Sequence, residues 1–273
     1  MRTSLSSFVY LNHTLDSAIE HTATAGFDAI DIWGGRPHAF RTDLREHHIR
    51  HLRELLDDFG LEVASFIPAQ VHYPTILCHP RKSIRFDSID YMTQSVETAA
   101  RLGAPIISVA AGHTLDDQDK DEGWDLLADS LLRICEFASN YDVLVAIEPA
   151  NPLETDLINT TIQAMDMIDQ LGCENLGVIF DTGHALLVGE DTPAAIEHLG
   201  ERLFHLHLSD NHGQRDERLI PGRGNYDFQA LIRALNLAMY DGCLTAELGW
   251  DYTRNPDPAA AEAQDFLENL ISE

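Results

Sequence analysis

Eight short apolar runs, each of 4–6 residues, alternate with longer amphipathic segments along the chain. Runs of this length have the size of a buried strand, and several lack the polar/apolar alternation of a strand with one face in water. We expect strands at Leu5–Val9, Ala29–Ile32, Glu62–Ile67, Pro105–Ala110, Val143–Ile147, Leu176–Phe180, Leu203–Leu208 and Cys243–Ala246.

The amphipathic segments have the period of helices, and several are followed by a glycine that can end a helix in the left-handed conformation. We expect helices at Thr14–Ala25, Asp43–Phe59, Arg85–Leu102, Trp124–Tyr141, Thr161–Leu171, Asp191–Leu199, Asp227–Leu237 and Pro258–Leu270. Eight strand–helix units predict one α/β domain, a single (β/α)8 TIM barrel over residues 1–273. A doubly wound open sheet is the alternative, but no GxGxxG motif follows the first strand.

Four consecutive predicted strands place acidic residues or histidine at the same end. Glu148 and Asp181 end the fifth and sixth strands, His207 lies near the end of the seventh, and Glu247 ends the eighth. Active sites of such barrels lie at these strand ends. Because buried charges are costly unless they are paired or bind a metal, we expect one divalent cation here: Mn²⁺, Mg²⁺ or Co²⁺, with Zn²⁺ as a further option. For any one residue alone, capping a helix or pairing with an arginine is the alternative.

Two more histidines lie close to this set. His205 and His207 point to the same face of their strand, and His207 is the better ligand because it is nearer the rim. His205 is then a packed or supporting group one layer lower. His184, three residues after Asp181, is either a substrate contact or a further ligand.

The charge of the chain excludes some partners. Asp and Glu number 45 against 18 Lys and Arg, a net charge of −27. Such a surface repels the phosphate backbone of nucleic acids and the anionic leaflet of a membrane. We find no apolar run of transmembrane length, no signal-peptide pattern and no CxxC among the four cysteines, so we expect a cytoplasmic protein without disulfides.

The balance of basic residues also predicts a salt response. Only Lys82 and Lys120 are lysines, and an acidic surface with few lysines resembles the halophilic composition of proteins from salt-loaded cytoplasms. We expect the thermal unfolding midpoint to rise between millimolar and molar KCl, because salt screens the repulsion among the carboxylates. Circular dichroism melts at several KCl concentrations check this, and a midpoint that does not move with KCl contradicts it.

Five segments match, in order, the motifs of one family. They are Ile147–Pro149 with Asn151, Asp181–His184, His205–Asp210, Ile220–Gly224 and Glu247. Together they resemble the sugar phosphate isomerase/epimerase superfamily of xylose isomerase-like barrels, and the resemblance covers essentially the whole chain. Within that superfamily, Ile32–Phe40 after the second strand resembles the ketose 3-epimerases.

The resemblance implies a metal-dependent epimerase or isomerase of sugars that acts through a cis-enediolate. The ligands of the one divalent cation are then Glu148, Asp181, His207 and Glu247. Glu148 and Glu247 also form the acid/base pair, since one base removes a proton and the other returns one to the opposite face. Relatives often pair through their outer helices, so a homodimer or homotetramer is expected.

The resemblance also suggests how the sugar is held. His184 and an arginine of the loop after the seventh strand contact the substrate oxygens, with Arg218 as first choice and Arg215 as second. His113, after the fourth strand, lines the pocket or faces solvent. Trp33 walls the sugar or packs in the core, and the same two options hold for Phe66 and Tyr73.

Other activities use similar barrels. An inosose dehydratase and an aldose–ketose isomerase share the fold, the metal and the enediolate. A zinc phosphodiesterase resembling apurinic endonucleases would add His72 and His113 as ligands, but it needs Asp-x-His where this chain has Asp216-Glu217-Arg218. A non-catalytic sugar-binding barrel would leave the Glu148 and Glu247 pair without a role.

Overall fold

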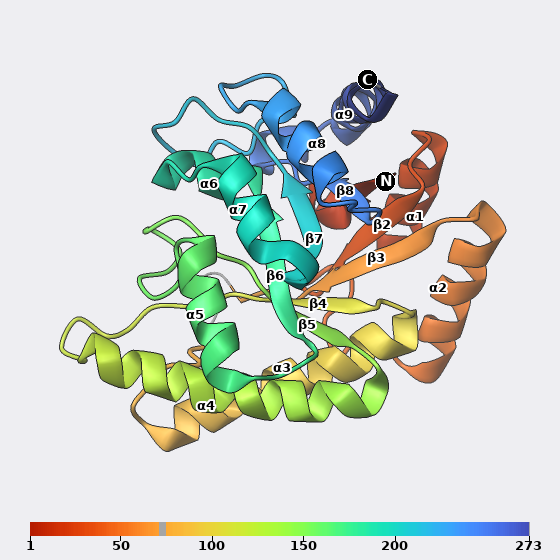
Figure 1. Ribbon diagram of the computed structural model, residues 1–273. Helices are drawn as coiled ribbons and strands as arrows, with labels where there is room; N and C mark the ends of the chain where they lie inside the picture. Colours follow the sequence, from red (N-terminus) through yellow and green to blue (C-terminus); the bar gives the residue numbers. More distant parts are fainter. Residues whose placement is uncertain (71–74, 273) are drawn as a thin grey trace.

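The predicted strands form a closed parallel barrel in which each strand pairs with the next one in the chain. The computed structural model describes residues 1–70 and 75–272 (Figure 1). The barrel closes between the first and last strands, where Leu5 lies opposite Ala246. The strands are β1 (Arg2–Ser6), β2 (Ala29–Trp33), β3 (Glu62–Ile67), β4 (Ile106–Val109), β5 (Leu144–Ile147), β6 (Leu176–Asp181), β7 (Leu203–Leu208) and β8 (Cys243–Ala246).

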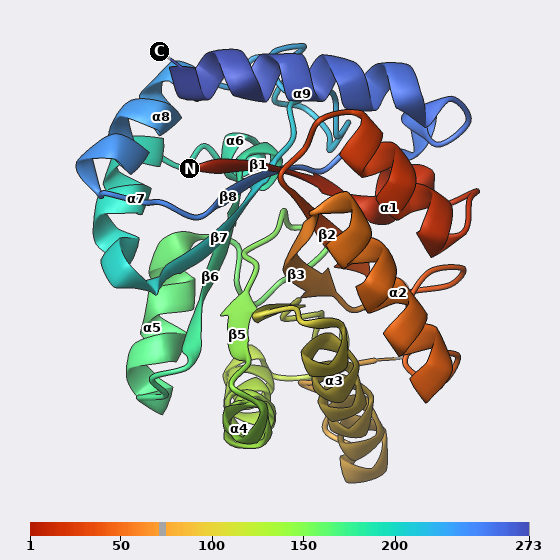
Figure 2. The ribbon, with the colours of Figure 1, turned by 90° about the vertical axis from the view of Figure 1, so that its right-hand side faces the viewer.

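The helices surround the strands in chain order. Figure 2 shows α1 and α2 on the right, α3 and α4 below, α5, α7 and α8 on the left, and α9 on top. The α-helices are α1 (Leu15–Thr24), α2 (Glu46–Phe59), α3 (Lys82–Leu102), α4 (Lys120–Ala138), α5 (Thr161–Leu171), α6 (Thr182–Val188), α7 (Thr192–Leu199), α8 (Phe228–Leu237) and α9 (Pro256–Ser272). No helix in the described part of the chain is long and apolar enough to cross a membrane.

Local capping explains where the helices begin and end. The Thr14 hydroxyl accepts a hydrogen bond from the backbone N–H of Ser17 at the start of α1. Gly60 and Gly103 end α2 and α3 with φ angles of 64° and 87°, as the sequence indicates. Helix α4 begins four residues earlier than expected because the Asp119 carboxylate caps its first turn.

One α-helix in the described part of the chain was not predicted. Helix α6 begins directly after β6, because the Asp181 carboxylate accepts a hydrogen bond from the His184 backbone N–H at 2.8 Å. The segment is only seven residues long, so its sequence carries too few turns to show a helical period. This short helix brings the His184 side chain back toward the mouth of the barrel.

The strands bury two different faces. Leu206 of β7 points toward the surrounding helices and is part of the apolar core, whereas His205 and His207 point into the barrel. The barrel interior therefore holds polar side chains close to the strand ends, and the site is built on these.

Candidate functional site

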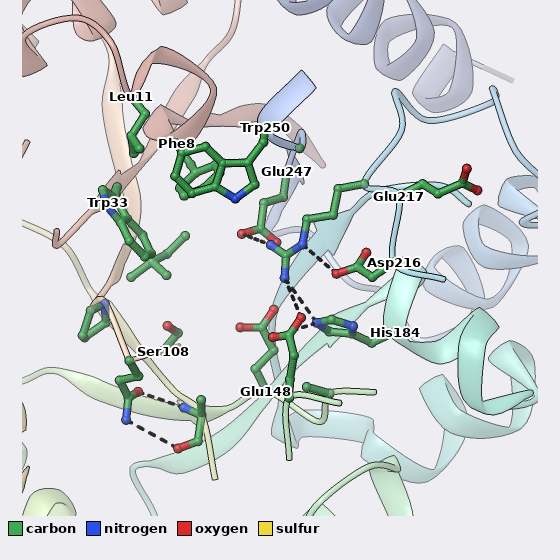
Figure 3. Close-up of a pocket in the computed structure, with 18 of the residues that line it drawn as sticks. Phe8, Leu11, Trp33, Ser108, Glu148, His184, Asp216, Glu217, Glu247 and Trp250 are labelled. Atoms are coloured by element: carbon green, nitrogen blue, oxygen red, sulfur yellow. Dashed lines mark hydrogen bonds and ion pairs between the residues drawn. The ribbon is translucent and has the colours of Figure 1, made fainter. Parts of the chain in front are cut away.

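A cavity of about 650 Å³ opens at the carboxyl ends of the strands. Figure 3 shows charged side chains on one side of it and aromatic side chains on the other. The residues predicted from the sequence that line the cavity are Trp33, Glu148, His184, Arg215, Arg218 and Glu247.

The four predicted metal ligands meet at the inner end of this cavity. Glu148, Asp181, His207 and Glu247 each offer one ligand atom, and these atoms lie within 4.8 Å of one another. Nδ1 of His207 lies 2.7 Å from Oε1 of Glu148 and 3.7 Å from Oε2 of Glu247. The barrel fixes this arrangement, because the four residues come from four neighbouring strand ends.

The backbone hydrogen bonding of the sheet extends one residue beyond β5 and β8, to the two glutamates. The backbone N–H of Glu148 donates to the carbonyl of Val109, and that of Glu247 donates to the carbonyl of Leu208, both at 3.0 Å. The two side chains are therefore carried by backbone that is fixed to a neighbouring strand, rather than by free loops.

The electrostatics of the cluster favour a cation. Burial, together with the charges of Glu247 and Glu148, raises the pKa of Asp181 to about 6. Burial opposes ionisation of His207, but the carboxylates of Glu148 and Glu247 outweigh it and raise the pKa of His207 well above its usual value. Burial also opposes ionisation of Glu148, but the charge of His207 outweighs it and lowers the pKa of Glu148 to about 2.

Two buried oxygen atoms of the cluster lack hydrogen-bond partners among the described residues: Oδ2 of Asp181 and Oε2 of Glu247. The other oxygen of each carboxylate is engaged by the protein, one by the His184 backbone and one by Arg218. A buried carboxylate oxygen without a partner is unfavourable. Three carboxylates and one imidazole match the ligand preference of a divalent cation, so the residues fit such an ion.

A further buried carboxylate lies below the ligand set and was not predicted from the sequence. Asp31 of β2 is fully buried, and its Oδ2 accepts hydrogen bonds from Nε2 of His205 at 2.7 Å and Nε2 of His207 at 3.1 Å. His205 therefore has the supporting position expected of it. The sequence does carry a sign that Asp31 is unusual, because it is an acidic residue in the middle of an otherwise apolar strand.

The guanidinium group of Arg218 lies among three carboxylates on the cavity wall. Its distances are 2.8 Å to Glu247, 2.9 Å to Asp216 and 3.5 Å to Glu154. Arg215, the second choice from the sequence, lies at the rim with its side chain 78% exposed. The structure thus places Arg218 beside the ligand set. The pairing of Arg218 with Glu154 and Asp216 was not predicted from the sequence.

The conformation of the loop is what brings Arg218 inward. Asp210 is fully buried and accepts backbone hydrogen bonds from Gly222 at 3.1 Å and Gly224 at 2.7 Å, which holds the loop. Arg218 itself has a left-handed φ of 44°, a conformation that is costly for a residue with a Cβ atom. Its carbonyl accepts a hydrogen bond from Gly249 at 2.9 Å.

His184 is buried next to this arginine. The Asn151 amide lies 3.2 Å from Nδ1 of His184 and can donate to it, which leaves Nε2 on the side of Arg218 and Glu154. Asn151 belongs to the motif Ile147–Pro149 plus Asn151 noted in the sequence. The geometry thus gives His184 a polar atom beside the cavity.

Aromatic rings line the opposite side. Phe8 packs edge-to-face against Trp33 and Trp250, with ring centroids 5.1 and 5.0 Å apart. Trp250 is 66% exposed although it lines the cavity. Trp33 was predicted from the sequence, whereas Phe8 and Trp250 were not. Phe66 is fully buried in the core and, among the described residues, is not part of the cavity lining.

The three other candidates are His113, His72 and Tyr73, and the structure describes only the first of them. His113 has 45% of its side chain exposed, and its ring contacts the Leu153 carbonyl at 3.1 Å. Within the described parts of the chain it does not line the cavity, which agrees with the solvent-facing alternative. His72 and Tyr73 lie outside the described residues.

Comparisons with known proteins agree with this architecture. A family model described as "Xylose isomerase-like TIM barrel" matches residues 19–270. Fructoselysine 3-epimerase of Shigella flexneri is 26% identical over 273 residues, which cover 100% of this chain and 99% of the relative. L-ribulose 3-epimerase of Mesorhizobium japonicum is 26% identical over 254 residues, which cover 90% and 80%. The structure of D-psicose 3-epimerase from Clostridium cellulolyticum H10 with D-tagatose superposes with a TM-score of 0.85 at 21% identity and covers 99% of both chains, which shows a common fold.

Proposed function

The chain belongs to the xylose isomerase-like TIM barrel family, and from this premise we propose that it is a divalent-metal-dependent epimerase of a ketose or a related carbohydrate. The observation that carries the proposal is the meeting of Glu148, Asp181, His207 and Glu247 within 4.8 Å at the inner end of a cavity large enough for a sugar. Relatives named as sugar 3-epimerases support the substrate class.

The proposed reaction inverts a carbon next to a carbonyl group. One base must remove the proton from one face of that carbon, and a second group must return a proton to the other face. Glu148 follows β5 and Glu247 follows β8, so their carboxylates reach the cavity from strands that β6 and β7 separate. In Figure 3 the two side chains enter the cavity from below and from above. This placement supports Glu148 and Glu247 as the acid/base pair.

The four ligand residues would hold one cation, with Mn²⁺, Mg²⁺ or Co²⁺ favoured by the oxygen-rich donor set. When bound, the ion supplies charge stabilisation for the carbonyl and neighbouring hydroxyl oxygens of the sugar. The protein adds Arg218 and Nε2 of His184 as hydrogen-bond donors for these oxygens. Both groups are positioned by buried partners before a substrate arrives.

The aromatic side of the cavity suits the apolar face of a sugar. Trp33, Phe8 and Trp250 form a continuous edge-to-face set opposite the charged wall. Packing of the C–H groups of the sugar on these rings would exclude water from the reacting carbon, while the polar wall selects the hydroxyl groups.

The position of Arg218 argues against a three-metal phosphodiesterase. Glu154, His184 and Asp216 are close enough together to form a second ion site. The Arg218 guanidinium, however, already contacts all three of these side chains. A permanent positive charge there opposes a further cation, which supports a site with one metal.

A substrate panel tests the proposal. Ketoses, aldoses and inososes are incubated with the metal-supplied protein in deuterated water at high KCl, and products are identified by chromatography and NMR. We expect a ketose to be converted to its epimer with deuterium at the inverted carbon. Conversion of an aldose to a ketose, or loss of water from an inosose, would assign one of the alternative activities instead.

Substitution of Arg218 tests the substrate-binding wall. We expect Arg218→Gln to lower kcat/KM by about 10–100-fold, because a hydrogen bond to a charged partner is worth roughly 1.5–3 kcal/mol. Steady-state kinetics on the sugar found in the panel measures the change. Arg215→Gln is the matched control at the exposed rim and should retain the wild-type values. Equal effects of the two substitutions would contradict the choice of Arg218.

A further inference from the structure

Asp31 is a carboxylate sealed inside the barrel, below the cavity. It is fully buried, and hydrogen-bond donors from β1, β3, β7 and β8 converge on it. Oδ1 accepts from Ser4 at 3.1 Å and from Thr245 at 3.0 Å. Oδ2 accepts from Ser65 at 2.8 Å and from His205 and His207 at 2.7 and 3.1 Å.

This number of donors determines what Asp31 can do. An ionised carboxylate accepts hydrogen bonds but cannot donate them, and both oxygens of Asp31 are already engaged. Although Asp31, His205 and His207 are close enough together to suggest an ion site, no Asp31 oxygen is left free for an ion. The carboxylate instead keeps a proton on Nε2 of His207, the atom that faces it.

The opposite ring atom of His207 faces the ligand set. Nδ1 lies 2.7 Å from Glu148 and 3.7 Å from Glu247. A neutral histidine carries its proton on one nitrogen only, and the hydrogen bond at that nitrogen decides which atom can bind a metal. Without metal, the Glu148 carboxylate also accepts a proton-bearing Nδ1. A bound cation displaces that proton, because metal ligands must be deprotonated. The proton on Nε2 stays with Asp31, so the lone pair of Nδ1 is then directed at the cation.

We propose, resting on the proposed function, that Asp31 is a positioning residue that holds His207 with its proton on Nε2 and presents Nδ1 to the cation. His205 is the second ring bound to the same carboxylate oxygen and keeps that oxygen from turning away from His207. Ser4, Ser65 and Thr245 fix the carboxylate itself. The ligand set thus depends on a residue of β2 that never reaches the cavity.

Asp31→Asn tests this role. The asparagine amide can donate to Nε2 of His207, which favours a proton on Nδ1 and so blocks the ligand atom. We expect the affinity for Mn²⁺ to fall by about 10–100-fold, as for other partners of metal-bound histidines. Titration calorimetry with Mn²⁺ alone measures this without turnover. Asp28→Asn is the matched control, since Asp28 accepts a hydrogen bond from Thr3 at 2.9 Å instead, and it should keep the wild-type affinity.

The wild-type protein offers a second readout that does not depend on the folding of a variant. NMR of ¹⁵N-histidine-labelled protein should show a slowly exchanging proton on Nε2 of His207, both metal-free and loaded with Mg²⁺. A His207 proton on Nδ1 alone would overturn the proposal, as would wild-type Mn²⁺ affinity in Asp31→Asn. If the wild-type protein binds no divalent cation, the proposed function fails, and the NMR result still decides whether Asp31 sets the proton position.

Discussion

Glu247→Gln is expected to lower kcat by about 10²–10⁴-fold, the usual contribution of a general acid or base. Glutamine keeps the size of the side chain and one of its two oxygen atoms, but it cannot take up or release a proton at neutral pH. Oε1 of Glu247 forms an ion pair with Nη1 of Arg218 at 2.8 Å, and the amide oxygen of glutamine can accept from the same guanidinium group. We therefore expect KM for the sugar to change much less than kcat.

The measurement combines steady-state kinetics with exchange of the substrate's carbon-bound proton in deuterated water, after the metal content of the variant has been matched to wild type. Glu217→Gln is a suitable control, because it makes the same chemical change at a lining residue whose carboxylate pairs with His212 and Arg215 instead of the ligand set. That variant should retain wild-type kcat. Solvent exchange at the wild-type rate in Glu247→Gln would remove Glu247 from the acid/base pair.

Removal of divalent metal should abolish activity and lower stability. Without an ion, the carboxylates of Glu148, Asp181 and Glu247 lie together in a buried site with unpartnered oxygens, and their repulsion destabilises the fold. An ion at 100 times its Kd stabilises the folded state by about 2.7 kcal/mol. We expect EDTA-treated protein to be inactive and to unfold at a lower temperature than the reloaded protein.

Mn²⁺, Mg²⁺ and Co²⁺ are added back separately, and activity and unfolding temperature are measured in parallel. Asp181→Asn serves as the control variant, since it removes one charge of the ligand set and should show a much smaller stabilisation by metal. Activity and unfolding temperature that EDTA leaves unchanged would contradict the assignment of the ligand set.

The barrel and the meeting of the four candidate ligands could be predicted because chain order determines both. In a barrel of parallel strands every strand ends at the same rim, so residues at the strand ends are neighbours however far apart they are in sequence. This rule singled out Glu148, Asp181, His207 and Glu247 as neighbours, the family resemblance implied that they bind one cation, and the structure brings the four side chains together.

Features that depend on side-chain packing or loop conformation could not be predicted in this way. Asp31 meets His205, 174 residues away, only because barrel closure brings β2 and β7 to one interior layer. Arg218 points into the cavity because its backbone is left-handed, a conformation that the local sequence does not indicate. The sequence alone therefore left Arg215 as an alternative. Trp250 reaches the cavity from a short 3₁₀ turn, Trp250–Tyr252, after β8, which carries no periodic signal.

A single-turnover experiment in deuterated water tests the central claim most directly: that Glu148 and Glu247 exchange protons with opposite faces of one carbon beside a bound cation. Excess metal-loaded protein is mixed with each of the two epimers in turn, and the first product is analysed by mass spectrometry and NMR. We predict one solvent deuterium at the inverted carbon of the product in both directions, because the group that returns the proton is not the one that removed it. A product that retains the substrate's own hydrogen at that carbon would contradict the two-carboxylate account.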